Sequence, residues 1–292
     1  MTTLRRGIYP DGGAPAKLTG MSIASFYPGK SVLITGASSG IGEELANQLA
    51  AAGAKLILAA RRREQLESIA QSIAARGFAE PVVAECDVAR DGDLERAVEA
   101  GVRAWGKLDI AIANAGFGVT GPIKRLTIED YRRQFETNVF GVLRTIYAAL
   151  PELEKARGNI AINGSVAGWV ASPGGSAYAM SKFALRGLCD SITPELRRVG
   201  VKVTLLSPGF VVSNFRRVDN SNEVHPGMKD RAPDWLQMRT DLAVREILRA
   251  VAHGKREQVV TFHGKILVKL ERFQPWVIRA LNEKFAPRSR QE

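Results

Sequence analysis

Tyr178 and Lys182 are the residues in this sequence whose types and spacing point most directly to chemistry. They are four residues apart, so on a helix they share a face. An isolated tyrosine has a pKa of about 10 and supplies little phenolate at neutral pH. A nearby ammonium lowers that pKa, so Tyr178 could exchange a proton with a substrate oxygen. Ordinary surface pairs have the same spacing, and the interpretation therefore depends on other motifs.

A glycine-rich loop, TGASSGIG at residues 35–42, lies between a short apolar run and a segment with helical spacing. Its glycines let the backbone turn sharply and approach a pyrophosphate, and the following helix N-terminus favours phosphate. The loop predicts a dinucleotide site, although a tight turn without a ligand would use the same residues. The residues assigned to this site are Gly36, Ser38, Ser39, Gly40, Ile41 and Gly42.

The choice of cofactor is predicted about twenty residues further on, where sheets that bind NAD usually carry an acidic residue. Here the second apolar run ends in arginines, Arg61 to Arg63, without an acid. Because the planar guanidinium of Arg61 can pair with a 2′-phosphate, we expect NADP(H), although these arginines could simply begin a solvated helix. Asp87 and Val88, after the third run, could border the adenine or form an ordinary strand end.

The motifs together resemble those of the short-chain dehydrogenase/reductase family. The resemblance rests on the glycine loop, Asn114-Ala115-Gly116, Asn138, Ser165 and Tyr178-x-x-x-Lys182, in matching order over about residues 30–215. It implies a Rossmann-type fold, a nicotinamide cofactor and an oxidoreductase acting on a small-molecule carbonyl or alcohol. The catalytic residues that it implies are Asn138, Ser165, Tyr178 and Lys182.

Individual roles follow from chemistry and from this resemblance. Ser165, after an apolar run at 159–163, could hydrogen-bond a carbonyl oxygen as charge develops there. The resemblance implies that Asn138 holds a water that connects Lys182 to solvent. It also implies that the segment 208–213 contacts the nicotinamide, with Ser213 where the family usually has Thr. Beyond the glycine loop, Arg61, Asp87 and Val88, the expected cofactor contacts are Asn114, Ala115, Gly116, Tyr178, Lys182, Pro208, Gly209, Val211 and Ser213.

Apolar runs of four to six residues alternate with helical patterns along the chain, which indicates strands buried on both faces and crossovers between parallel strands. We therefore predict an α/β fold with a doubly wound parallel sheet, in a single domain with a helical C-terminal extension. The expected parts are a flexible arm over 1–28, a Rossmann-type dinucleotide-binding catalytic domain over 29–252 and a basic amphipathic extension over 253–292.

The net charge of +11 is concentrated at the two ends of the chain. Such an excess is compatible with anionic lipid, nucleic acid or a solvated surface, but no nucleic-acid recognition motif is present. Cys86 and Cys189 are expected to be reduced structural thiols, and no metal-ligand spacing occurs among the three histidines and two cysteines. We expect a cytoplasmic protein without a metal, and association with a membrane is left open by the extension.

Two segments carry expectations about partners. Residues 210–240 are predicted to form an apolar lid over a medium-sized or lipid-like substrate, and Trp169 either lines that pocket or packs in the core. In the extension, apolar residues at helical spacing predict an amphipathic element interrupted by Pro275. This element would cover the mouth of the substrate site or touch a membrane, or its apolar face would pack on its own domain or on a partner subunit. The apolar positions are Ile266, Leu267, Leu270, Phe273, Trp276, Val277, Ala280, Leu281 and Phe285.

The family resemblance also implies a homo-oligomer, because helices corresponding to residues 131–150 and 176–198 pair across subunits in many members. The main alternative to an enzyme is a cofactor-binding regulatory protein without turnover. An intact set of Ser165, Tyr178 and Lys182 argues against that alternative.

Overall fold

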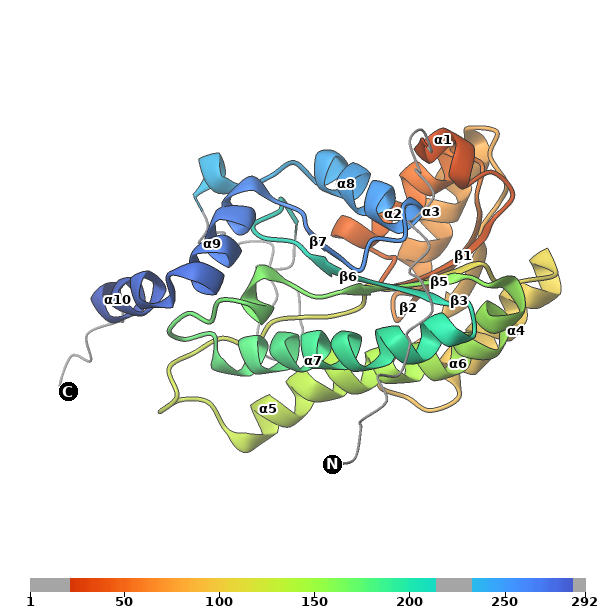
Figure 1. Ribbon diagram of the computed structural model, residues 1–292. Helices are drawn as coiled ribbons and strands as arrows, with labels where there is room; N and C mark the ends of the chain where they lie inside the picture. Colours follow the sequence, from red (N-terminus) through yellow and green to blue (C-terminus); the bar gives the residue numbers. More distant parts are fainter. Residues whose placement is uncertain (1–21, 214–232, 286–292) are drawn as a thin grey trace, which may run out of the picture.

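A seven-stranded parallel sheet is the centre of the computed structural model, which describes residues 22–213 and 233–285 (Figure 1). The strands lie in the order β3-β2-β1-β4-β5-β6-β7. Successive strands are added on one side of β1 up to β3 and on its other side from β4 onward, so the strand order switches between β1 and β4. In this register Leu33 of β1 lies between Ile57 of β2 and Ala111 of β4. The strands are β1 Ser31–Thr35, β2 Lys55–Ala60, β3 Val82–Glu85, β4 Ile110–Ala113, β5 Asn159–Asn163, β6 Lys202–Ser207 and β7 Glu257–Val259.

Helices cover both faces of the sheet, as Figure 1 shows, and each face has its own apolar core. One face is covered by α2 Gly40–Ala51, α3 Arg63–Ala75 and α8 Thr240–Ala252. The other is covered by α4 Asp93–Trp105, α6 Gly141–Ala156 and α7 Ser176–Arg198. The predicted doubly wound α/β fold is thereby confirmed. None of the helices among the described residues is long and apolar enough to cross a bilayer.

The folded domain starts before the predicted boundary at residue 29. Ser22 caps the short helix α1 Ile23–Phe26, and the side chain of Tyr27 is fully buried. The Tyr27 hydroxyl donates to the carbonyl oxygen of Leu248 in α8 over 2.8 Å. Residues 22–28 therefore belong to the domain and not to a flexible arm, while the rest of the expected arm lies outside the described residues.

The sheet also continues past the predicted boundary at residue 252. Strand β7 pairs with β6, with Val259 opposite Ser207, so the start of the expected extension completes the sheet. The helical part of the extension consists of α9 Phe262–Phe273 and α10 Pro275–Phe285.

The helix expected over residues 131–150 is in fact three consecutive segments. The α-helix α5 Ile128–Phe135 is followed by a five-residue π-helix, Glu136–Phe140, which leads directly into α6. Such π turns inside helices are rare and occur frequently at functional sites. The only buried residue of the π-helix is Asn138.

We predict that Tyr27→Ala lowers the free energy of unfolding by about 3–5 kcal/mol, because a large buried ring is removed. Tyr27→Phe should lower it by about 1 kcal/mol through loss of the bond to Leu248. Chemical denaturation monitored by circular dichroism measures both. Tyr147→Ala is a matched control, because Tyr147 is 67% exposed. A Tyr27→Ala protein as stable as this control would show that the N-terminal segment does not contribute to the core.

Candidate active site

The carboxyl ends of three neighbouring strands, β1, β4 and β5, meet at one edge of the sheet and are joined there by hydrogen bonds. The Asn114 amide after β4 donates to the carbonyl oxygens of Thr35 (3.0 Å) and Gly36 (3.3 Å) after β1. The Asn163 amide at the end of β5 donates to the Asn114 carboxamide oxygen over 2.9 Å. The Asn163 backbone carbonyl then accepts from Lys182 Nζ over 2.8 Å. A continuous chain of bonds therefore runs from the glycine loop to Lys182.

The glycine loop has a backbone that only glycine can form. Gly36 and Gly40 have φ of +64° and +58°. A Cβ at Gly42 would lie 2.1 Å from the carbonyl oxygen of Gly36, so a side chain there would force the loop apart. Helix α2 begins at Gly40 and directs its N-terminal N–H groups to this edge. The loop therefore fits the predicted pyrophosphate.

Arg62 lies across the glycine loop, a contact that was not predicted. Its guanidinium donates to the hydroxyls of Ser38 (2.9 Å) and Ser39 (2.8 Å). Arg61 is exposed next to it, whereas Arg63 pairs with Glu67 on the outside of α3 (2.7 Å). The run of three arginines indicated a basic site, but their spacing alone could not show which of them contacts the glycine loop.

Lys182 is buried below Tyr178, one helical turn away on α7 as expected. Its Nζ lies 5.6 Å from the centroid of the Tyr178 ring, and its side chain is 5% exposed. Burial lowers the pKa of Lys182 to about 7. Burial thus opposes the protonated form of Lys182, and it is this protonated form that would favour a Tyr178 phenolate.

Asn138 and Gly116 come together with Lys182. A Cβ at Gly116 would lie 3.1 Å from the Asn138 carboxamide oxygen and 3.9 Å from Lys182 Nζ. The fully buried Asn138 side chain bonds both the N–H (3.1 Å) and the carbonyl oxygen (3.0 Å) of Phe117. These bonds fix the loop after β4 beside Lys182. The structure thus brings three of the predicted residues to one place.

Ser165 follows β5 and begins the short 3₁₀ helix Val166–Gly168. Its hydroxyl accepts from the N–H of Ala167 over 3.0 Å. This turn packs on α7 so closely that a Cβ at Gly168 would lie 2.6 Å from the carbonyl oxygen of Lys182. The segment that carries Ser165 is therefore seated against the helix that carries Tyr178 and Lys182.

Trp169, considered above as a pocket or core residue, is in the core. It is 4% exposed, and its indole N–H donates to the Ser207 hydroxyl over 3.0 Å. The guanidinium groups of Arg186 and Arg272 lie over its ring, at 3.6 and 4.6 Å from the centroid.

The segment after β6 returns to the glycine loop. A Cβ at Gly40 would lie 3.3 Å from Ser213 Cβ, so Ser213 lies against the loop as the prediction of a cofactor contact requires. Val211 is buried and bridges to Met238. Within the expected lid, Phe215 and Met228 lie outside the described residues, whereas Trp235 is 83% exposed.

His263, at the start of α9, holds this segment and was not predicted. Its Nε2 accepts the N–H of Phe210 over 3.0 Å, and its ring stacks on the Phe210 ring at 5.4 Å. A Cβ at Gly209 would lie 2.3 Å from both His263 Nε2 and the Thr261 hydroxyl. The contact joins residues 53 positions apart, which no local pattern reveals.

Asp87 and Val88 are at the carboxyl end of β3, where the adenine contact was predicted. Asp87 accepts from the N–H of Ala89 over 3.0 Å. Val88 is buried, and a Cβ at Gly141 would lie 2.7 Å from it. Val88 thus packs against the first residue of α6, and its role toward adenine stays a prediction.

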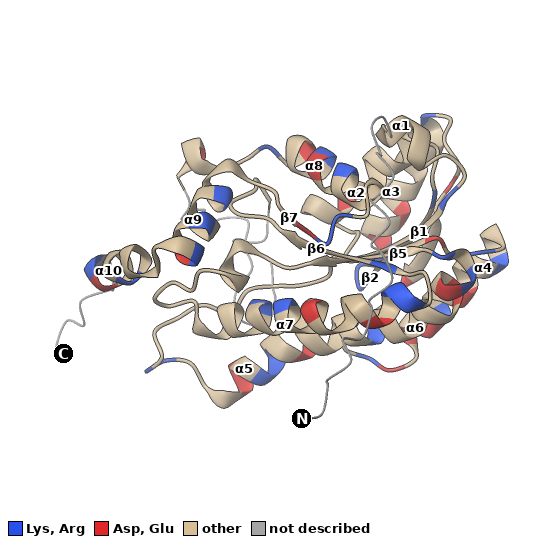
Figure 2. Cartoon of the chain, in the orientation of Figure 1, with Lys and Arg blue, Asp and Glu red and all other residues tan. Residues whose placement is uncertain are grey.

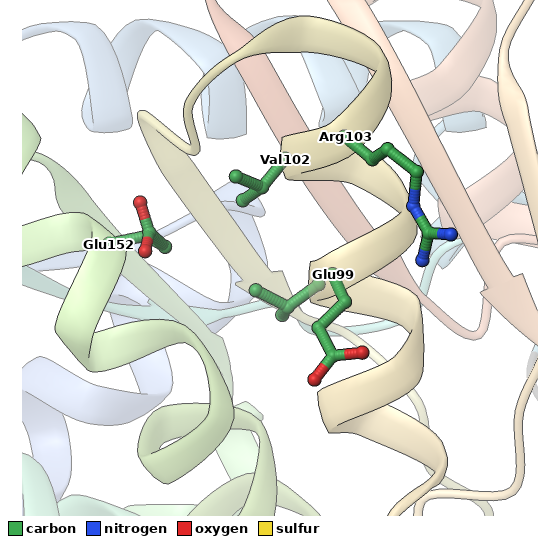
Figure 3. A pocket seen from close by; sticks show the side chains of 5 residues that line it. Glu99, Val102, Arg103 and Glu152 are labelled. Carbon is green, nitrogen blue, oxygen red and sulfur yellow. The ribbon is translucent and has the colours of Figure 1, made fainter.

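A separate hollow lies between α4 and α6, away from the strand ends that hold the candidate residues. It is lined by Val98, Glu99, Val102, Arg103 and Glu152. In Figure 3, Arg103 extends away from Glu152. None of the predicted site residues lines this hollow.

Comparison with known proteins gives consistent matches. Residues 30–224 match the short chain dehydrogenase family. An uncharacterized oxidoreductase of Listeria innocua is 37% identical over 202 residues, which are 68% of this chain and 81% of the relative. A dehydrogenase/reductase SDR family protein 7-like of Dictyostelium discoideum is 31% identical over 91% of this chain and 84% of its own length.

Two further comparisons bear on ligands. An 11-beta-hydroxysteroid dehydrogenase A of Sesamum indicum is 32% identical over 78% of this chain and 67% of the relative. The structure of an alcohol dehydrogenase from the archaeon Thermococcus sibiricus, complexed with 5-hydroxy-NADP, is 28% identical. It superposes with a TM-score of 0.68 over 80% of this chain and 96% of its own length.

We predict that His263→Leu weakens binding of the expected cofactor NADPH about two- to tenfold, because the hydrogen bond that seats Phe210 is lost. His263→Gln, which retains an acceptor, should bind more nearly like the wild type. Titration of NADPH by calorimetry measures both, and thermal unfolding controls for folding. Unchanged affinity in the Leu variant would remove His263 from the site.

The same contact gives a pH dependence. Burial holds the pKa of His263 below its ordinary value of 6.5, so Nε2 remains an acceptor at neutral pH. As pH falls through that lowered pKa, protonation removes the acceptor, and wild-type affinity for NADPH should drop. The Gln variant should lack this drop. Parallel pH profiles of the two proteins would contradict the assignment.

Proposed function

This chain belongs to the short-chain dehydrogenase/reductase family, an oxidoreductase family, and from that premise we propose that it transfers hydride between NADP(H) and a carbonyl or alcohol substrate. The observation that carries the proposal is the hydrogen-bonded chain from the glycine loop through Asn114 and Asn163 to Lys182. It connects a site suited to a dinucleotide with the expected proton-transfer pair, of which Tyr178 is half-buried and Lys182 is buried. When bound, the nicotinamide supplies or accepts the hydride.

In the proposed mechanism the protein transfers the proton to or from the substrate oxygen and stabilises the charge that develops on that oxygen. Tyr178 gives its phenolic proton to the substrate oxygen during reduction and takes it back during oxidation. Lys182, when protonated, would stabilise the phenolate, and it would bond the ribose hydroxyls of the cofactor. Ser165 donates to the same substrate oxygen. Asn138, whose side chain is fixed by Phe117, holds the surroundings of Lys182 in place and supports a water that connects it to solvent.

The proposal of NADP(H) over NAD(H) is supported by the basic end of β2 and by the NADP analogue named for the archaeal alcohol dehydrogenase. Arg61 is exposed directly after the end of β2, and Arg62 contacts Ser38 and Ser39 of the glycine loop. No acidic residue follows β2 before Glu64.

For the substrate we propose a medium-sized, largely apolar carbonyl or alcohol. Phe210 is 36% exposed beside the candidate site, and one relative is named for a hydroxysteroid. We also retain the prediction of a homo-oligomer, which is supported by apolar side chains exposed on or beside the outer faces of α6 and α7. These side chains are Phe140, Tyr147, Met180 and Phe183.

We predict that Tyr178→Phe lowers kcat about a thousandfold, within the range for loss of a general acid/base, while NADPH affinity stays near the wild-type value. Steady-state NADPH oxidation with a panel of ketones and aldehydes measures it. Tyr147→Phe, which removes an exposed hydroxyl, is the control. Turnover near the wild-type rate in Tyr178→Phe would exclude this mechanism.

We predict that Arg61→Asp lowers the ratio of kcat/KM for NADPH to that for NADH by about tenfold or more, because a charge-assisted bond to the 2′-phosphate is lost. Arg63→Asp makes the same charge change on the outside of α3 and should leave the ratio nearly unchanged. Arg62→Asp tests the neighbouring residue. If only Arg62→Asp changes the ratio, the phosphate partner is Arg62, and if none does, the preference has another origin.

A further inference from the structure

Apolar side chains of α9 and α10 form a surface facing solvent, which we call the exposed apolar strip. It consists of Phe262, Ile266, Phe273, Trp276 and Leu281. Phe262, Phe273 and Trp276 are 78%, 74% and 67% exposed. On α9 the members are four and seven residues apart, so they occupy one side of that helix. Contiguous exposed apolar patches on soluble proteins commonly mark a binding surface.

Other side chains of both helices anchor α9 and α10 to the body, so the strip stays exposed. On α9, Val268 is buried in the core, and Arg272 pairs with Glu257 of β7 at 3.0 Å. On α10, Ile278 is buried, and the Asn282 amide donates to the carbonyl oxygen of Ala171 over 2.9 Å. Figure 1 shows α9 and α10 extending from the body, with α10 outermost. Packing on its own domain, one of the alternatives considered for this face, does not cover the strip.

Basic side chains border the strip. Between residues 262 and 284 there are five lysines and arginines but only two glutamates, and Figure 2 shows the basic residues along both helices. Lys269 lines the same shallow groove as Ile266 and Phe273. Lys265 is exposed one turn before it. The surface therefore combines aromatic and aliphatic groups with a positive border.

We propose that the exposed apolar strip docks on an anionic lipid bilayer, with α9 and α10 lying in the headgroup region. An interfacial helix needs an apolar face with aromatic residues and basic flanks, and Phe273, Trp276 and Lys269 provide both. Each lysine or arginine near an anionic surface adds to the attraction. The net charge of +11 acts in the same direction at longer range.

The charges favour lipid over a second copy of this chain. A twofold interface would bring the same patch of both copies together, and with it Lys265 and Lys269 of each, so like charges would oppose association. Lysine is also depleted from protein interfaces. An anionic bilayer instead complements every basic group on the border.

The strip begins beside the candidate site. Phe262, its first member, precedes His263, which holds Phe210 of the segment after β6. Docking would therefore place the expected mouth of the site near the bilayer and let an apolar substrate enter from it. This consequence rests on the proposed function, whereas docking itself does not.

Cosedimentation of the full-length protein with vesicles, without substrate or cofactor, tests the proposal. We expect binding to vesicles of equal parts phosphatidylglycerol and phosphatidylcholine, weaker binding to phosphatidylcholine alone, and weakening by salt. The double variant Phe273→Ser/Trp276→Ser should reduce partitioning at least about tenfold, since it removes two large apolar side chains that would be buried in the bilayer. Lys265→Gln/Lys269→Gln should reduce binding to the anionic vesicles about tenfold or more.

Matched controls change equally exposed residues elsewhere. Ile123→Ser/Ile128→Ser removes two apolar side chains that are each 69% exposed, and Arg197→Gln/Arg198→Gln removes two charges from the end of α7. Both controls should bind like the wild type. The proposal is overturned if the wild type ignores anionic vesicles or if the controls lose as much binding as the strip variants. It is also overturned if sedimentation equilibrium shows that Phe273→Ser/Trp276→Ser dissociates an oligomer, because a second copy then covers the strip.

Discussion

The carboxamide of Asn114 is the connection on which the rest of the site depends. It stands between β1 and β5 at the edge where the strand order reverses, and it satisfies backbone carbonyls of the glycine loop while accepting from Asn163. Buried polar groups are costly when unpaired, so this arrangement fixes the ends of three strands relative to one another. Lys182 bonds the last member of the chain. The distance between the proposed phosphate site and the proposed proton-transfer site is thereby set by the sheet.

The fold was predictable because its signals are local and repeated. Runs such as residues 31–35 and 55–60 are apolar throughout, which in an alternating pattern leaves few arrangements other than a parallel sheet covered by helices on both faces. The glycine loop was also predictable. Gly36 and Gly40 have φ values of +64° and +58°, and glycine is the residue that adopts such values readily. Motif order then implied Asn138, Ser165, Tyr178 and Lys182 as a set.

What could not be predicted depends on contacts between distant segments. Tyr27 looked like part of a loose arm because its partner, Leu248, is 221 residues away. His263 is an isolated histidine in the sequence and becomes informative only when Phe210 lies against it. Arg61 and Arg62 are neighbours of the same residue type, and only the structure shows that Arg62 contacts Ser38 and Ser39. Asn163 gives no motif of its own, and its importance comes from its position between Asn114 and Lys182.

The π-helix at Glu136–Phe140 makes this part of the chain sensitive to length as well as to composition. A π turn holds one residue more than the corresponding α-helical turn, and each residue advances an α-helix by about 100°. Removing one residue here would restore a regular helix, yet it would rotate everything on one side of the deletion relative to the other. Asn138 could then keep its hydrogen bonds to Phe117 only if α6 no longer packed on the sheet in its present orientation. A single deletion in this turn would therefore disturb the structure more than a substitution that keeps its length.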